Sequence, residues 1–137
     1  MAYELIWEPD GVLARFSGVV TARQFIQSVE ETQGDPRFDE AHYVINDFSE
    51  VSDHELSEQT LTQLAAMNYG AHASNPNCRV VYVTTDEALT QSLKDALVRG
   101  DMTSYQTEVQ PTVSDARDWL DGQPKLHILS NVMGFRI

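Results

Sequence analysis

The amino-acid sequence predicts an α/β domain with a mixed β-sheet that opens with a β-hairpin, continues as parallel βα units and carries about four helices. Near the start, an alternating run leads through a turn sequence into a second strand, which is the pattern of a hairpin. Two later runs, residues 43–45 and 79–83, are apolar on both faces, as central parallel strands are. The segments that follow these runs show helical periodicity, so strands and helices alternate along most of the chain.

The first two strands are predicted to flank a turn at residues 8–11, E-P-D-G. Residues 3–7, YELIW, alternate between apolar and polar side chains, and residues 12–20, VLARFSGVV, form the second strand. Pro9 presets the turn dihedral, and Gly11 is expected to accept a positive φ. The pattern therefore predicts a tight antiparallel hairpin.

A capped helix is predicted directly after the second strand. Thr21 is its expected N-cap, and Gln24 can reach back to complete a capping box. Val20 before the cap and Phe25 after it have the spacing of a hydrophobic staple. The Gly-Asp-Pro sequence at residues 34–36 should end this helix.

Three further helices and a weaker strand complete the expected order, β-β-α-β-α-β-α-β-α. Residues 106–110, QTEVQ, predict the strand, and residues 113–120, VSDARDWL, predict the last helix. The expected inward-facing residues of the three helices are Leu61, Leu64, Ala65 and Asn68, then Leu89, Leu93, Ala96 and Leu97, and finally Val113, Ala116, Trp119 and Leu120.

An apolar tail, residues 123–137, follows the expected domain of residues 1–122. A segment this apolar should not stay in water, so it either covers its own domain or packs on a second copy to form a homodimer. Both alternatives stay open. Its apolar residues are Leu126, Ile128, Leu129, Val132, Met133, Phe135 and Ile137.

Composition argues against several functional classes. Nine basic and 21 acidic residues give a formal charge of −12, which repels phosphate backbones, so we expect no nucleic-acid partner. Cys78 is the only cysteine, so no intramolecular disulfide can form. No apolar run approaches the ~18 residues of a membrane span, and residues 1–11 lack a signal-peptide pattern. These observations predict a cytoplasmic protein.

No motif of a cofactor site or of a catalytic centre occurs in the sequence. Both glycine-rich nucleotide loops and the G-x-S-x-G nucleophile elbow are missing. His54 lies between two acids, but adjacent residues of a helix point apart and cannot share one metal. The other histidines, His42, His72 and His127, form no metal-binding pair. We therefore expect no cofactor, no metal site and no enzymatic activity.

Asp47 is a candidate binding residue because of its position. It ends an apolar strand, and α/β folds place binding sites at the carboxyl ends of parallel strands. The alternative is a structural carboxylate that caps the nearby loop or helix N-terminus. Both interpretations stay open.

The element order and the D-F-S-x-V sequence at residues 47–51 resemble the STAS fold of anti-sigma-factor antagonists. In that family a D-S-S-G stretch opens the next helix, and its second serine is phosphorylated. Laid on this chain without gaps, the stretch falls on residues 55–58, where Ser57 keeps the serine and the other three positions differ. The resemblance implies that Asp47, Ser49 and Ser57 are the candidate binding or regulatory residues.

The sequence is similar to the SpoIIAA-like branch of this superfamily, which is related to CRAL-TRIO/SEC14 lipid-binding domains. The similarity rests on residues 18–25, the strand with Asp47 and residues 114–120, and it spans about residues 3–121. It implies a non-enzymatic module that binds a protein partner or a small apolar ligand. The alternative is a SEC14-like carrier of a lipid or small apolar ligand that contacts membranes transiently.

Local sequence predicts that the helix after this strand starts at Ser52. Ser52 and Glu55 have capping-box spacing, and Val51 with Leu56 would form a hydrophobic staple. Ser57 would then lie in the second turn, beyond the free N–H groups that favour a phosphate. On this basis we expect Ser57 to be a poor phosphorylation site, since nearby acids would also repel the phosphate.

Overall fold

The computed structural model describes residues 2–98 and 105–126. These residues form a five-stranded sheet in the order β1-β2-β3-β4-β5, in which only the β1–β2 pair is antiparallel. The strands are β1 (Tyr3–Glu8), β2 (Gly11–Val20), β3 (Tyr43–His54), β4 (Arg79–Val83) and β5 (Gln106–Gln110). The described helices are α1 (Ala22–Gly34), α2 (Glu58–Ser74), α3 (Glu87–Leu93) and α4 (Val113–Asp121), with a 3-10 turn at Pro36–Glu40 and a π-helical turn at Lys94–Val98. The predicted α/β class and element order are confirmed.

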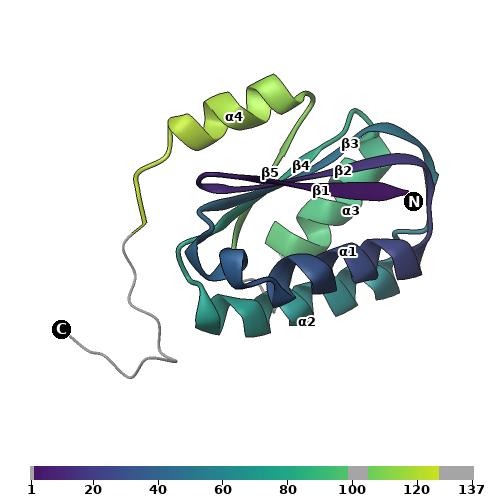
Figure 1. Ribbon diagram of the computed structural model, residues 1–137. Helices are drawn as coiled ribbons and strands as arrows, with labels where there is room; N and C mark the ends of the chain where they lie inside the picture. The colour runs from purple at the N-terminus through teal and green to yellow at the C-terminus, as the bar shows by residue number, and fades with distance from the viewer. Residues whose placement is uncertain (1, 99–104, 127–137) are drawn as a thin grey trace.

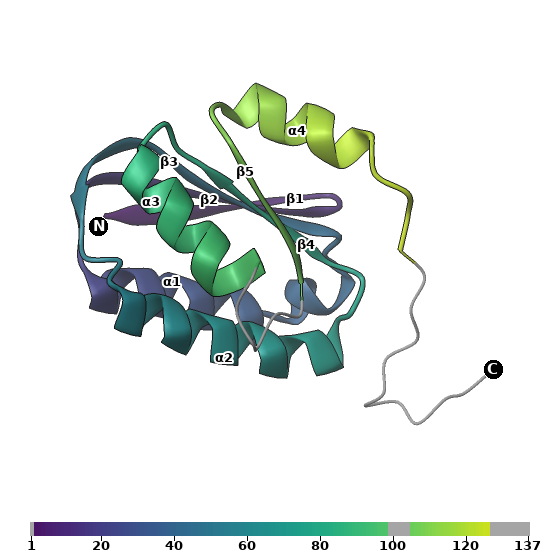
Figure 2. The same cartoon turned by 180° about the vertical axis from the view of Figure 1, so that it is seen from behind.

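Helices cover the two faces of the sheet unequally. Each crossover from β2 to β5 advances by one strand, and since such crossovers are right-handed, α1, α2 and α3 lie on the same face. Figures 1 and 2 show these three helices on one face and α4 alone on the other. All four helices begin just after the ends of β2 to β5, at Val20, His54, Val83 and Gln110. We call this side of the molecule the helix-start edge.

The two faces of the sheet carry separate cores. Under α1 and α2, the rings of Phe16 and Phe48 lie 4.8 Å apart, and Phe25 of α1 lies within 6 Å of both. The core under α4 is smaller and consists of Leu13, Ile45, Val81, Val83 and Ala116. The expected inward stripes are confirmed, because every member is buried or packs on one of these cores.

Gly11 is needed for close packing and not for its backbone angle. The expectation of a positive φ there is wrong, because in the described residues only Gly18 has one, at 66°. A Cβ on Gly11 would lie 2.5 Å from the Tyr43 carbonyl oxygen and 2.6 Å from its ring. Glycine is therefore required because β2 and β3 approach closely at this point.

The capping box of α1 is confirmed. The Thr21 hydroxyl accepts the Gln24 N–H at 3.1 Å, and the Gln24 side chain accepts the Thr21 N–H at 3.0 Å. Val20 and Phe25, the predicted staple, are fully buried in the same core. The helix ends at Gly34, as the Gly-Asp-Pro sequence predicts.

The predicted start of the following helix is wrong. β3 does not end near Asp47 but continues to His54, because its later residues pair with the end of β2 after β4 has stopped. The Glu55 N–H then donates to the Val20 carbonyl at 2.9 Å, which keeps the chain in a sheet-like connection. Ser52 therefore lies in a strand, and α2 begins at Glu58 with Ser57 as its N-cap.

The predicted apolar tail lies mostly outside the described residues, which end at Leu126. Residues 127–137 are not described, so the tail's packing on its own domain or on a second copy stays a prediction, as does the boundary at residue 122.

Candidate functional site

Four helix N-termini gather at the helix-start edge, and a side-chain oxygen caps each one. Each cap accepts the backbone N–H of the residue three positions later. The remaining free N–H groups and the helix dipoles make this edge favourable for negative charge. The four caps are Thr21, Ser57, Asp86 and Thr112.

Ser57 is exposed at the start of α2. Its hydroxyl oxygen accepts the Thr60 N–H at 3.3 Å and lies 3.1 Å from the Thr60 hydroxyl. Its carbonyl accepts the Leu61 N–H at 3.0 Å, which closes the first turn. Leu56, directly before it, is buried in the main core and anchors the chain there. The hydroxyl is thus held at a fixed place on the surface.

The connection before Ser57 is tied to two neighbouring helices. The Glu55 carboxylate accepts the Ala22 N–H of α1 at 3.1 Å. His54 Nδ1 accepts the Leu56 N–H at 3.1 Å, and its Nε2 lies 3.7 Å from the Asp86 carboxylate of α3. Because Nδ1 is an acceptor, a neutral His54 must carry its proton on Nε2, facing Asp86. These contacts fix the position of Ser57 relative to α1 and α3.

Much of the acidic cluster between residues 47 and 58 has a structural role at this edge. Glu55 satisfies a free N–H of α1, and Glu58 lies in the first turn of α2. The Asp53 carboxylate accepts the next backbone N–H, that of His54. Acids are stabilising near helix N-termini, so the cluster does not require a catalytic explanation.

Asp47 and Ser49 do not join Ser57 in one site. Asp47 lies on the α4 side of β3, as Ile45 does, and is only 4% exposed. Its Oδ1 accepts the Ser49 N–H at 2.9 Å, and Ser49 itself is exposed. Over the described ranges, no hydrogen bond or ion pair joins Asp47 to Ser57. Asp47 caps none of the described helices either. Its carboxylate forms a hydrogen bond within β3, the strand that carries it.

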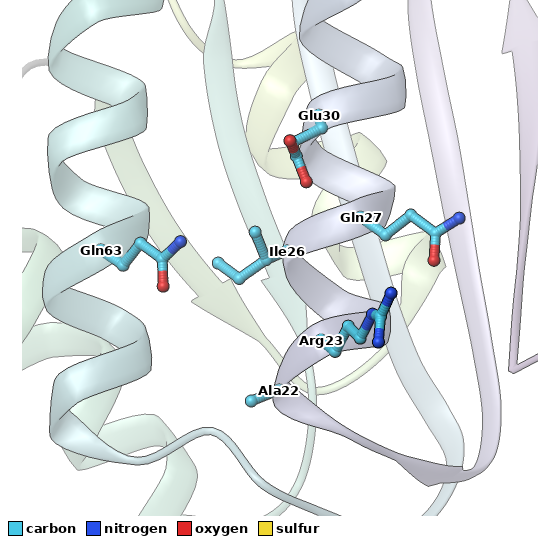
Figure 3. A pocket seen from close by; sticks show the side chains of 6 residues that line it. All are labelled: Ala22, Arg23, Ile26, Gln27, Glu30 and Gln63. Carbon is cyan, nitrogen blue, oxygen red and sulfur yellow. The ribbon is translucent and has the colours of Figure 1, made fainter.

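A groove between α1 and α2 adjoins the helix-start edge. It has a volume of about 390 Å³, and Figure 3 shows Ile26 and Gln63 pointing toward each other across it, while Gln27 points to the other side of α1. Ile26 is partly buried against the main core, so the groove has an apolar base and polar walls. Its lining residues are Ala22, Arg23, Ile26, Gln27, Glu30 and Gln63.

Val19 adds an exposed apolar side chain at the same edge. It is 58% exposed and pairs with Asp53 near the end of β3. Sequence reasoning placed Val19 in a strand and Ile26 in a helix but identified neither as surface residues. The strand position that pairs with Val19 is the charged Asp53, and this pairing could not be read from the sequence.

The described residues leave little space for an apolar ligand beneath α1 and α2. The cavity between α1, α2 and the sheet has a volume of about 20 Å³, which holds about one water molecule. The buried side chains of Asn46 and Tyr82 line it, and neither has a hydrogen-bond partner in the described part of the chain. A lipid would enter this cavity only if α1 and α2 moved away from the sheet.

Two further properties of the described residues bear on other functions. No cluster of three or more metal-binding side chains occurs among residues 2–98 and 105–126. Within those same ranges, every helix is too short or too polar to cross a bilayer.

Comparison with known proteins identifies the fold. Neither a protein-family model nor a curated protein sequence matches the chain. The anti-sigma factor antagonist SpoIIAA, in its unphosphorylated form, superimposes with a TM-score of 0.62 at 12% identity over 89% of this chain and 100% of that chain. An uncharacterized DUF3478-family protein from Shewanella loihica PV-4, which has a SpoIIAA-like fold, superimposes with a TM-score of 0.52 at 17% identity over 87% and 92%. The chain therefore has the SpoIIAA-like STAS fold, as the sequence resemblance predicts.

Proposed function

We propose that this chain is a non-enzymatic STAS-like interaction module of a bacterial cytoplasm. It binds a protein partner at the helix-start edge, and Ser57 is its regulatory residue. The position of Ser57 carries the proposal. Ser57 is the residue that keeps the serine of the family pattern, and it caps α2 as an exposed hydroxyl. The similarity to SpoIIAA, an anti-sigma factor antagonist, supports a regulatory role.

A phosphate fits at Ser57 better than the sequence alone indicates. The sequence pattern predicts Ser57 in the second turn of the helix, but Ser57 is the N-cap of α2 and lies beside the free N–H groups of the first turn. Glu55 and Glu58 both oppose a phosphate by repulsion, and the hydrogen bond from the Ala22 N–H directs the Glu55 carboxylate toward α1. Phosphorylation would add a double negative charge to the edge without unfolding α2.

The partner surface extends from Ser57 over the groove between α1 and α2. Ile26 supplies apolar contact, and Arg23 and Gln63 supply polar contact around it. A partner docked here would sense the charge at Ser57 directly. The net charge of −12 argues against nucleic acid as the partner.

An enzymatic function and a carrier function have less support than an interaction module. An enzyme would need a reactive group, and Asp47, the acid suggested by the sequence, is buried and bonded to its own strand. A SEC14-like carrier would need an apolar chamber, and the cavity beneath α1 and α2 has a volume of about 20 Å³. Native mass spectrometry tests the carrier, because a retained lipid would support it. The same spectra report whether the full chain forms a homodimer.

Site-specific photo-crosslinking in the native host tests the docking surface. A photoreactive residue replacing Gln63 should capture a defined protein, and the Ser57→Asp change in the same chain should reduce that capture. The matched control replaces Asp118 on α4, an exposed position on the other face of the sheet. Equal capture from Gln63 and Asp118, or capture unaffected by Ser57→Asp, would contradict the proposal.

A further inference from the structure

Arg79 is a buried cation without a charged partner. It begins β4 on the side of the sheet that α4 covers, and it is 8% exposed. Its Nε donates to the Gln106 side-chain oxygen at 2.6 Å, which is a neutral acceptor. Over residues 2–98 and 105–126, no carboxylate lies within ion-pair distance of its guanidinium, and neither Nη group donates a hydrogen bond. Burying a charge is costly unless it is paired, so this arrangement calls for an anion.

Arg79 faces a groove at the opposite side of the molecule from Ser57. The groove has a volume of about 530 Å³, in the range of small-molecule sites. It lies beside the end of α4 and the first residues of β3 and β4. Tyr43, Leu120 and Leu126 give it apolar walls, and Lys125 adds a second cation.

The other arginine of the groove already has its counter-charge. Arg117 donates two hydrogen bonds to Glu8, at 3.0 and 2.8 Å, and the Tyr43 hydroxyl donates to the same carboxylate. The same groove therefore contains one arginine, Arg117, that is paired with a carboxylate and one, Arg79, that is not. The available guanidinium donors are therefore those of Arg79.

We propose that this groove binds a small molecule with a single carboxylate on an apolar body. The carboxylate would accept hydrogen bonds from the Nη groups of Arg79 in a bidentate ion pair. The apolar body would lie against Tyr43 and Leu120. Asp10 and Asp121 at the groove repel a doubly charged phosphate more than a singly charged carboxylate. The site is independent of the proposed partner surface, which lies at the helix-start edge.

An NMR titration of the isotope-labelled full chain tests the proposal, with sodium benzoate and sodium hexanoate as probes. Saturable shifts at the Arg79 Nε–H and at the Tyr43 and Gln123 amides are expected. The neutral analogues benzamide and hexanamide should bind about tenfold or more weakly, because they cannot form the charged pair. Inorganic phosphate should bind more weakly than either carboxylate.

Arg79→Gln should weaken carboxylate binding about tenfold or more. The variant should still fold, because it removes an unpaired buried charge and keeps a polar partner for Gln106. Arg15→Gln removes an exposed arginine from β2 and serves as the matched control, with unchanged binding. The proposal is overturned by an absence of saturable carboxylate shifts, by equal binding of the amides or by tighter binding of phosphate. The amide and phosphate comparisons use the unmodified chain, so they decide the matter even if Arg79→Gln does not fold.

Discussion

The hydroxyl oxygen of Ser57 accepts the N–H of Thr60 at 3.3 Å and thereby caps α2. This relationship moves the start of the helix from Ser52, where the sequence pattern places it, to Ser57. It also moves Ser57 from the interior of a helical turn to a position beside free N–H groups. The regulatory interpretation of Ser57 depends on this change.

The cap predicts a clear difference between two serines. Ser57→Ala should lower the free energy of unfolding by about 1 kcal/mol, because it leaves a first-turn N–H without its acceptor. Ser52→Ala, at an exposed strand position, should stay within about 0.5 kcal/mol of the parent chain. Urea unfolding of both variants measures the difference. A larger loss for Ser52→Ala would show that the helix starts where the sequence pattern places it.

Two glycines should respond to alanine in opposite directions. Gly11→Ala forces a Cβ to within 2.5 Å of the Tyr43 carbonyl and should cost about 1–3 kcal/mol of stability, since backbone must move. Gly70→Ala adds a Cβ with no atom within 4 Å inside α2, and it should stabilise the protein by about 0.5–1 kcal/mol. Thermal melting measures both. A stabilising Gly11→Ala would refute the close approach of β2 to β3.

The pairing of Glu8 with Arg117 predicts an acid-dependent loss of stability. The two hydrogen bonds from Arg117 hold the pKa of Glu8 below its ordinary value of 4.5. The stabilising contribution is therefore fully present above pH 4.5 and is lost as the pH falls through the lower pKa of the folded state. The pair is partly exposed, so we expect about 1 kcal/mol.

Urea midpoints across the acid range measure this contribution of Glu8. Glu8→Gln should have a shallower loss of stability below pH 4.5 than the parent chain. Glu4→Gln, an exposed change on the same strand, should keep the parent profile. If Glu8→Gln and the parent chain lose stability in parallel, the ion pair does not contribute to the acid profile.

Cys78 should react only when the protein unfolds. Its thiol is 1% exposed, and burial raises its pKa to about 12, so it is protonated and shielded at neutral pH. A colorimetric thiol reagent should label the native chain far more slowly than the urea-unfolded chain. Native labelling as fast as unfolded labelling would show that the β3–β4 region opens readily.

The regular elements could be predicted because the positions of their apolar residues match the positions that are buried. β4 and β5 have the predicted bounds, since β4 is apolar on both faces and β5 is set off by turn residues. The end of β3 could not be predicted, because residues 49–54 are polar except for Val51 and are held by pairing with β2. The spacing of Ser52 and Glu55 is that of a capping box at a helix start. In the structure, however, the Glu55 N–H donates a hydrogen bond to the Val20 carbonyl.

The candidate sites were less accessible to sequence reasoning than the fold. Ser57 could be identified because the short D-S-S-G pattern of the resembling family places its second serine there. The contacts of Glu55 with Ala22 and of His54 with Asp86 join residues more than 30 positions apart, which no local pattern reports. Arg79 is an ordinary strand residue in the sequence, and only the three-dimensional arrangement shows that its charge has no partner in the described residues.

The most direct test of the central claim is the phosphorylation state of Ser57 in protein purified from its native host. Intact-mass and peptide mass spectrometry should find a fraction that carries one phosphate group, located on Ser57. A Ser57→Ala chain expressed in the same host should lose that fraction, whereas Ser49→Ala and Ser52→Ala should retain it. A chain that never carries phosphate, or a phosphate that persists in Ser57→Ala, would contradict the assignment of Ser57 as the regulatory residue.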